Sequence, residues 1–337
     1  MKGEDRFVEK LRALLPRSER VRIGPGDDAA VLSSSGADLV LTTDLLVEGV
    51  DFLPDEDPET IGRRALAVNL SDVAAMGGRP EFFLLSIAFR AERGEEFPLA
   101  VARGALSRAT PLGLDLVGGD LSDAKQTVVS VLLGGRVEGE PLTRSGGKHG
   151  DLLFLSGWPG RAAAGLRLTR LHANSGAPNT AAASSGLSRQ EERDLLDAYR
   201  DPEPRVGLGR FLSGESMAHA AIDVSDGLGV DASRLARASN ARVILERDRI
   251  PISPAVARLA AALGQDALDW ILAGGDDYEL LFAVPPELAS RLDPPAPGLG
   301  TFVTRVGRIE EGSGAVLQGP DGERNIAGLG HDHLDGA

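Results

Sequence analysis

The sequence has no cysteine, and histidine occurs only five times in 337 residues. The absence of thiols excludes disulfides, thiolate zinc sites and a cysteine nucleophile, and so few imidazoles argue against a histidine-rich metal site. Basic residues are also in deficit, since 36 Lys and Arg stand against 50 Asp and Glu, a formal net charge of -14. A protein that binds nucleic acid through its phosphates needs a basic surface. The composition therefore predicts no nucleic-acid partner.

Long apolar runs are missing as well. No segment reaches the roughly 20 residues that span a bilayer, and the charged start "MKGEDRFVEKLRALLPRSER" lacks the apolar core of a signal peptide. We therefore expect a soluble, cytoplasmic protein with no membrane partner. A hydrophobic content of 42% is enough for ordinary cores, and the length of 337 residues favours two domains over one.

Helix and strand patterns alternate along the whole chain, which predicts a mixed α/β (α+β) fold. The glycine-rich, charged stretch "GEPLTRSGGKHG" separates a predicted N-terminal domain, 1–138, from a C-terminal domain, 149–312, followed by a hairpin and tail, 313–337. The pattern over 302–319 predicts a hairpin that closes the chain. The segment 172–186, rich in Ser, Ala and Asn, predicts a loop.

The clearest helix is expected after Asp57, which can cap its first turn, with Pro58 in that turn and Gly77 at its end. Other helices are predicted at 6–15, 98–109, 160–171, 230–239 and 254–263. Strands are predicted at 38–44, 82–89, 114–120, 127–137, 151–157, 220–227, 241–246 and 278–284.

Two glycine motifs loosely match the dinucleotide-binding fingerprint. The first, 24–29, precedes a strand pattern where the fingerprint needs a helix. The second, 227–232, has the right context, but Asp223 and Asp226 stand where a pyrophosphate should meet bare backbone amides. An NAD-linked dehydrogenase stays open as an alternative on this motif. "SGGKHGD" does not have the spacing of a P-loop.

Aspartates recur where apolar stretches end. One carboxylate in a turn is usually a turn former or helix cap, and we assign that role to Asp57, Asp151 and Asp231. The others gather at strand ends and glycine turns, or on one helix face with Asn69: Asp28, Asp44, Asp72, Asp120, Asp223 and Asp226. Like charges brought to one place repel, which a bound cation relieves. Oxygen ligands without an EF-hand spacing favour Mg²⁺, which would let an acidic protein bind nucleotide phosphates.

Seven ordered stretches then carry a family likeness: "GPGDDAAVL", "TTDLLVEGVDF", "ALAVNLSDVAAMGG", "VGGD", "LTRSGGKHGD", "DVSDGL" and "GGDDYELLF". They resemble the thiamine-monophosphate kinase family, within the superfamily of aminoimidazole ribonucleotide synthetase and selenophosphate synthetase. The likeness runs from about Gly24 to Phe282.

The resemblance implies ATP-dependent, magnesium-dependent phosphorylation of thiamine monophosphate to thiamine diphosphate, the last step in making that cofactor. It also implies a homodimer whose N-terminal domains join their sheets into a barrel, with ATP in a groove beside it. The positions similar to the family's metal ligands are Asp28, Thr42, Thr43, Asp44, Asp72, Asp120, Asp223 and Asp226. Those similar to its ATP contacts are Gly119, Asp120, Arg144 and Ser225.

The substrate positions of the family fall on Asp51, Asp276 and His331, and all three depart from its usual residues. Asp51 stands where histidine is frequent, Asp276 where glutamate is common, and His331 where an aromatic residue usually packs. ATP and magnesium use is therefore better supported by the resemblance than the identity of the acceptor.

Phosphoryl transfer asks a protein mainly for positioning and charge neutralisation. Our hypothesis is that a group of aspartates holds magnesium between ATP and the acceptor phosphate, with Arg144 on the triphosphate. The hypothesis names Asp28, Asp44, Asp72, Asp120 and Asp223 as catalytic. Two alternatives remain open: another ATP-using member of the superfamily, and a magnesium-nucleotide-binding protein without catalysis.

Overall fold

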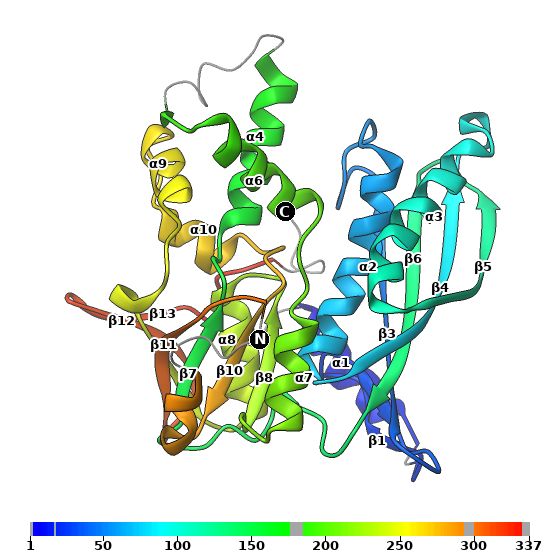
Figure 1. Ribbon diagram of the computed structural model, residues 1–337. Coiled ribbons are helices and arrows are strands. Elements are labelled where there is room, and N and C mark those ends of the chain that lie inside the picture. The colour runs from blue at the N-terminus through cyan, green and yellow to red at the C-terminus, as the bar shows by residue number, and fades with distance from the viewer. Residues whose placement is uncertain (1–2, 17, 176–184, 293–299, 332–337) are drawn as a thin grey trace.

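The computed structural model describes residues 3–16, 18–175, 185–292 and 300–331, and shows two α/β halves, each built around one sheet (Figure 1). None of the helices in these ranges is long and apolar enough to cross a bilayer.

The N-terminal half contains a six-stranded sheet in the order β1-β2-β3-β6-β4-β5. Neighbouring strands are antiparallel except β4 and β5, which are parallel. The strands are β1 (Val21–Ile23), β2 (Ala30–Leu32), β3 (Asp38–Val47), β4 (Arg79–Phe89), β5 (Asp115–Asp123) and β6 (Val128–Val137). The helices of this half are α1 (Gly3–Leu14), α2 (Pro58–Ala75) and α3 (Glu96–Ala109), with the 3-10 turns η1 (Ala91–Arg93) and η2 (Thr110–Leu112).

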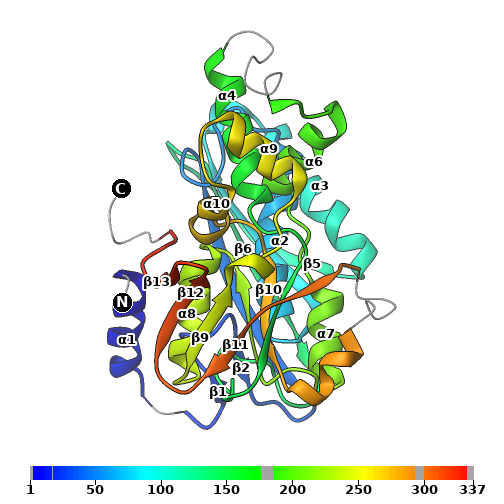
Figure 2. The same cartoon turned by 90° about the vertical axis from the view of Figure 1, so that its left-hand side faces the viewer.

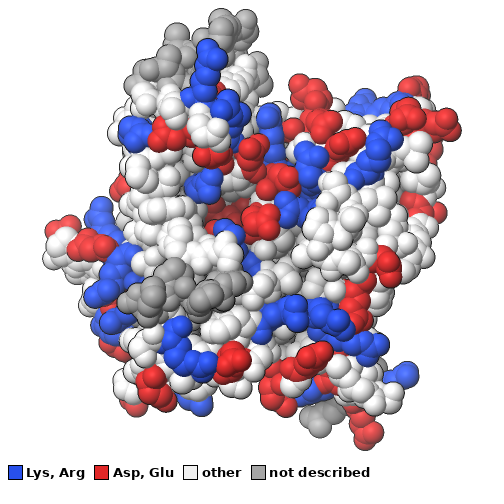
Figure 3. All heavy atoms as spheres, in the orientation of Figure 1, with Lys and Arg blue, Asp and Glu red and all other residues white. Residues whose placement is uncertain are grey.

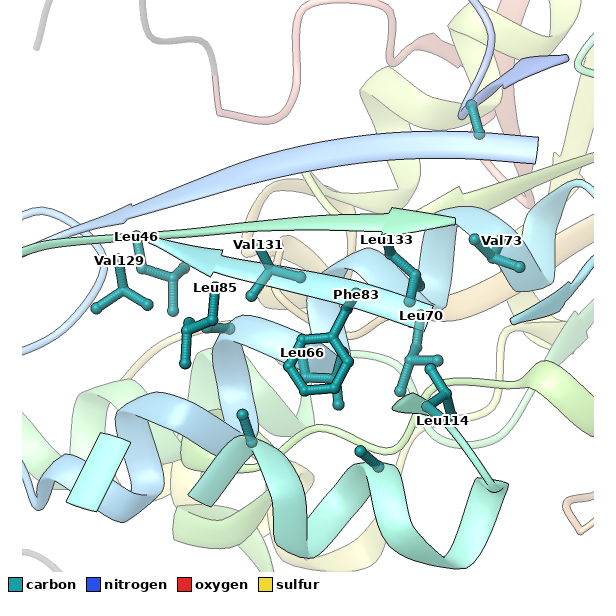
Figure 4. Close-up of a cluster of buried hydrophobic side chains, with 14 of the residues drawn as sticks. Leu46, Leu66, Leu70, Val73, Phe83, Leu85, Leu114, Val129, Val131 and Leu133 are labelled. Carbon is teal, nitrogen blue, oxygen red and sulfur yellow. The ribbon is translucent and has the colours of Figure 1, made fainter. Parts of the chain in front are cut away.

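Helices α2 and α3 cover one face of this sheet. Figure 4 shows Leu66 and Leu70 of α2 beside Phe83 of β4 within the buried cluster. The two helices can approach closely because Gly62 has no side chain. A Cβ atom at this position would lie 1.9 Å from the carbonyl oxygen of Val101. Helix α2 also contacts the C-terminal half, so it lies between the sheet and that half.

Helix α2 begins as its sequence predicts. The carboxylate of Asp57 accepts a hydrogen bond from the Thr60 amide at 2.9 Å, and Pro58 occupies the first turn. After the helix, Gly77 has a φ of 70°, which favours glycine. These signals are local in sequence, and the helix boundaries could be predicted from them.

None of the described helices covers the opposite face of the sheet (Figure 1). Leu132 of β6 and Leu45 of β3 lie on this face and are 39% and 61% exposed. Their neighbours along the strand, such as Val131 and Leu133, are fully buried on the helix side. The sheet is therefore apolar on both faces.

The C-terminal half contains a seven-stranded sheet in the order β13-β12-β9-β11-β7-β10-β8. Its strands are β7 (Leu152–Ser156), β8 (Ala220–Val224), β9 (Arg242–Glu246), β10 (Glu279–Val284), β11 (Val303–Glu310), β12 (Gly314–Gly319) and β13 (Gly322–Asn325). Its helices are α4 (Arg161–Ser175), α6 (Arg189–Arg200), α7 (Val206–Gly214), α8 (Leu228–Ala238), α9 (Pro254–Ala262) and α10 (Ala267–Ala273), with η3 (Arg247–Arg249) and η4 (Pro286–Leu292). Helices α8 and α10 pack on one face and α7 and η4 on the other. Helices α4, α6 and α9 form a layer at one end of the sheet (Figures 1 and 2).

The predicted hairpin over 302–319 is wrong. Arg242, at the start of β9, pairs with Glu310 of β11 on one side and with Gly314 of β12 on the other, so β9 lies between these two strands. Val243, Ile244 and Leu245 of β9 are all buried, as is typical of a strand inside a sheet whose two faces are both covered, and β9 occupies that inner position in place of a direct β11–β12 pairing. The hairpin at the end of the chain is instead β12 with β13, and both belong to the second sheet.

The predicted loop, 172–186, begins later than expected, because α4 continues to Ser175. Residues 176–184 lie outside the described residues. Helices α6, α7 and α10 were not predicted, although α6 has a clear signal. Ser188 and Glu191 form a reciprocal capping box at its start, a pattern that sequence alone can reveal.

Candidate active site

A cavity of about 910 Å³ lies between the two halves. Figure 3 shows acidic and basic side chains gathered around the hollow between them. Its walls come from α1, the turn before β2, β3, α2, the junction after β6, the turn after β8 and the loop before β10. The volume is in the range of sites that bind nucleotides and other small molecules.

Three carboxylates meet at the bottom of this cavity. Oxygens of Asp28, Asp72 and Asp223 lie within 4.8 Å of one another. Asp28 comes from the turn before β2, Asp72 from α2 and Asp223 from β8, so the site forms only when both halves are in place. Thr42 Oγ1 donates to Asp72 Oδ2 at 2.6 Å, and Ser71 Oγ donates to Asp223 Oδ2 at 2.7 Å.

Asp28 carries the observation that points to a ligand. Its Oδ2 atom is buried and has no hydrogen-bond partner among the described residues. Buried carboxylate oxygens without a partner are costly and rare unless a cation or ordered water meets them. Oxygen-only donors of this kind suit a hard divalent ion such as Mg²⁺.

The three acids are held close against their mutual repulsion. Burial raises the pKa of Asp72 well above its usual range, and the charges of Asp44, Asp223 and Asp28 raise it further. Burial and the charges of Asp28 and Asp231 raise the pKa of Asp223 in the same way. The cluster without a cation is therefore an unfavourable arrangement that a bound cation would relieve.

Arg144 supplies the positive charge that is built into this site. Its Nε donates to Asp28 Oδ1 at 3.0 Å, and its backbone amide donates to Asp27 Oδ1 at 3.1 Å. Burial opposes the charge on Arg144, but the carboxylates of Asp28 and Asp27 outweigh burial and raise its pKa. Asp27 was not among the predicted site residues. Burial and the adjacent Asp28 raise the pKa of Asp27 to about 6, and the paired acids of "GPGDD" were the available signal.

Strand β3 brings three more predicted residues to the cavity wall. Thr42, Thr43 and Asp44 line it together. Thr43 Oγ1 donates to the carbonyl oxygen of Val131 in the neighbouring strand at 3.0 Å, so this hydroxyl already serves the sheet.

The turn after β8 places Ser225 and Asp226 on the opposite wall. Asp226 forms an ion pair with Arg234 and is not one of the three clustered acids. The carboxylate of Asp231 accepts hydrogen bonds from the amides of Ser225, Asp226 and Gly227 at 3.0–3.2 Å. The amides that a dinucleotide pyrophosphate would need in the second glycine motif are therefore satisfied by the protein itself, which argues against the dehydrogenase alternative. The predicted turn role of Asp231 is confirmed.

Gly119 and Asp120 do not join these residues within one chain. They lie on β5, the edge strand, while Asp44 lies on β3 with β6 and β4 in between. Neither residue lines the cavity.

The three predicted substrate residues do line the same cavity. Asp51 Oδ2 accepts a hydrogen bond from the Val47 amide at 2.8 Å, so part of this carboxylate stabilises its own turn. Asp276 has a left-handed φ of 61° and pairs with Arg64 at 3.0 Å. His331 donates its amide to the Asp226 carbonyl oxygen at 2.9 Å, which ties the end of the described chain to the turn after β8.

Residues that were not predicted complete the cavity. Arg64 and Val68 precede Asp72 by two turns and one turn of α2 and line the cavity with it, a spacing that the sequence shows once Asp72 is suspected. Helix α1 lies beside α8 (Figure 2), where Asp5 pairs with Arg237 at 2.7 Å. No sequence pattern predicts this contact between α1 and α8.

The chain is similar to several known proteins in sequence and in fold. Residues 26–137 match the model of the AIR synthase related protein, N-terminal domain. A thiamine-monophosphate kinase of Pyrococcus abyssi is 33% identical over 92% of this chain and 91% of its own length. A solved structure described as AaThiL complexed with AMPPCP and TMP aligns with a TM-score of 0.82 and 29% identity, covering 98% of this chain and 95% of that one. A thiamine-monophosphate kinase from Stenotrophomonas maltophilia aligns with a TM-score of 0.76 and 35% identity, covering 94% and 97%.

Proposed function

The chain belongs to the thiamine-monophosphate kinase family, and from this premise we propose that it transfers the γ-phosphoryl group of ATP to thiamine monophosphate. The bond between the β,γ-bridging oxygen and the γ-phosphorus breaks, and a bond from an acceptor phosphate oxygen forms, giving ADP and thiamine diphosphate. The observation that carries the proposal is the cluster of Asp28, Asp72 and Asp223 beside Arg144, with a buried carboxylate oxygen that lacks a partner.

Each group of the chain has a defined task in this reaction. Asp28, Asp72 and Asp223, with Thr42 and Asp44 beside them, would hold magnesium ions. Magnesium, when bound, supplies the positive charge that neutralises and aligns the phosphates. Arg144 orients and neutralises the triphosphate with a guanidinium that its two neighbouring acids hold charged. The acceptor is already an anionic phosphate oxygen, so no side chain needs to remove a proton from it.

We propose a homodimer that closes the N-terminal sheets into a barrel. Strand β2 covers only Leu39–Leu41 of β3, so 42–47 have no partner on that edge among the described strands. Strand β5 leaves the other edge of the sheet open. Pairing β5 of a second copy with this part of β3 would bury the exposed apolar face and place Gly119 and Asp120 of that copy beside Asp44. Asp120 can then serve as a metal ligand, and Gly119 as an ATP contact, in the neighbouring active site.

The proposal includes an N-terminal domain at 1–138, a C-terminal domain at 149–312 and a hairpin and tail at 313–337. It also includes substrate contacts by Asp51, Asp276 and His331, and a metal-ligand role for Asp226. A cytoplasmic location stays a prediction from the sequence.

Mass spectrometry of the products tests the proposal. The protein is mixed with ATP, magnesium and thiamine monophosphate, and parallel samples contain chelator or free thiamine instead. We expect ADP and thiamine diphosphate in equal amounts, and no transfer with chelator. ATP binding without product would favour the non-catalytic alternative, and product from free thiamine would move the activity to a different kinase.

A further inference from the structure

Arg64 joins three parts of the cavity that are far apart in the sequence. It lies on α2, is 4% exposed, and forms an ion pair from Nη2 to Asp276 Oδ1 at 3.0 Å. Its Nη1 donates to the Tyr199 carbonyl oxygen at 3.0 Å, and its guanidinium lies 4.5 Å from the centre of the Tyr199 ring. The fork is thus fixed by two acceptors and one aromatic face, a geometry that lysine cannot reproduce.

The carboxylate of Asp276 is held on one side only. Tyr278 donates its hydroxyl to the same Oδ1 at 3.2 Å, so Arg64 and Tyr278 share that oxygen. Oδ2 has no hydrogen-bond partner among the described residues, and the side chain is 31% exposed at the cavity. One oxygen is locked by the protein and the other is available to a ligand.

The backbone around Asp276 is also fixed at some cost. Asp276 and Tyr278 both have left-handed φ angles, 61° and 49°, which are unusual for residues other than glycine. The Asp276 amide donates to the Ser225 carbonyl oxygen at 2.7 Å, which ties the loop to the metal side of the cavity. Strain that surrounding contacts maintain is frequent at functional sites.

Arg64 also carries a feature that stability alone would not retain. Its Nε atom is buried and has no hydrogen-bond partner among the described residues. Neighbouring Tyr199 donates its hydroxyl to the Asp51 carbonyl oxygen at 3.4 Å, so the same set of contacts reaches the turn that carries Asp51. The two acids on the substrate side are therefore connected through Arg64 and Tyr199.

Building on the proposed function, we propose that Arg64 is a positioning residue for the acceptor substrate. It holds Asp276 so that Oδ2 accepts from the thiamine moiety of thiamine monophosphate, and it neutralises a carboxylate that would otherwise repel the acceptor phosphate. The length of residue 276 and the fork of Arg64 are matched to each other. Glutamate at this position is one methylene longer and displaces its carboxylate from the Arg64 and Tyr278 contacts.

Steady-state kinetics of five variants test this inference: Arg64→Lys, Asp276→Glu, the double variant of both, Tyr278→Phe, and Arg63→Lys as control. Arg63 is the neighbour on the same helix, pairs with Asp201 and does not line the cavity. We expect each single variant at 64 and 276 to raise KM for thiamine monophosphate roughly 5- to 20-fold, the loss of a charged hydrogen bond partly replaced. The KM for ATP and kcat should stay within about twofold, and the control should match the parent.

The double variant distinguishes positioning from general damage. The longer acid compensates for the shorter reach of lysine, so its KM for thiamine monophosphate should fall below that of either single variant. Tyr278→Phe, which removes only the hydroxyl, should raise the same KM without unfolding the protein. The role of Arg64 is overturned if the single variants keep the KM of the parent. It is also overturned if the KM values for both substrates rise together and the two changes combine independently in the double variant. Either outcome leaves the proposed function itself standing. A parent protein that neither binds nor phosphorylates thiamine monophosphate overturns the proposed function as well.

Discussion

Replacing Asp72 by asparagine separates a metal ligand from an ordinary helix acid. Asp72 shares its space with Asp28 and Asp223, whose oxygens lie within 4.8 Å. Two unit charges about 5 Å apart repel by roughly 3 kcal/mol at an effective dielectric constant of 20. The raised pKa values of Asp72 and Asp223 show that proton uptake relieves part of this repulsion. We therefore expect the substitution to recover about 1–2 kcal/mol of the free energy of unfolding in chelator.

The hydrogen bond from Thr42 does not oppose this gain, because the amide oxygen of asparagine accepts it as the carboxylate does. In thermal melting with chelator, Asp72→Asn should match the parent or melt about 2–4 °C higher. With ATP and excess magnesium it should lose most of the stabilisation that the parent gains, since ligand stabilisation follows affinity. Phosphoryl transfer should fall by orders of magnitude.

Asp57→Asn is the matched control, because the same chemical change is made at the other end of α2. Asparagine is as good an N-cap as aspartate, so this variant should melt within about 2 °C of the parent and keep the full ligand shift. The reasoning is refuted if Asp72→Asn melts lower than the parent in chelator and still shows the full shift with ATP and magnesium.

Three further results are expected. Burial and the charge of Asp226 raise the pKa of Asp231 to about 7, and burial raises the pKa of Asp277 to about 8. Such acids still bind a proton in the folded state at pH values where the unfolded chain has released it. The free energy of unfolding therefore falls as the pH rises from about 4 through these folded-state pKa values. Melting in chelator should accordingly occur at higher temperature at pH 6 than at pH 8, and the opposite order would contradict the account. Asp51→His should lower KM for thiamine monophosphate and leave KM for ATP unchanged. The lost hydrogen bond from the Val47 amide should lower the free energy of unfolding in urea by about 1 kcal/mol. A changed KM for ATP would mean that Asp51 does not belong to the thiamine monophosphate subsite. Mixing and reassembling inactive Asp72→Asn and Asp120→Asn chains should restore about a quarter of the parent activity, since a two-fold dimer would form one intact site in each mixed pair; no recovery would mean that Asp120 does not act across the interface.

Local signals in the sequence predicted what local physics determines. Asp57, Pro58 and Gly77 marked the ends of α2, and the structure confirms them. The assignment of the catalytic acids drew on a different kind of pattern, carboxylates that end apolar stretches, and the structure brings Asp28 and Asp223 together.

Contacts between distant segments could not be predicted in this way. The pairing of Arg64 with Asp276 depends on how α2 lies against the loop before β10, and no periodicity in either segment encodes it. Asp120 shows the converse case. Its motif resembles those of the other acids, but the strand order places it at the far edge of the sheet. Strand order is set by pairing between distant segments, which the local sequence of a single strand does not specify.

The position of β9 and β7 in the second sheet has a consequence for how the chain folds. All pairings of the first sheet lie within Val21–Val137, so its strands can assemble as soon as that segment has left the ribosome. Strand β7 instead pairs with β10 and β11, and β9 pairs with β11 and β12, so the second sheet cannot be completed until the chain reaches Asn325. Pairings between segments so far apart are slow to form. During synthesis, the side of α2 that later contacts α7 and β8, which contributes Ala75 to the buried cluster there, therefore remains exposed to solvent until the C-terminal half begins to fold.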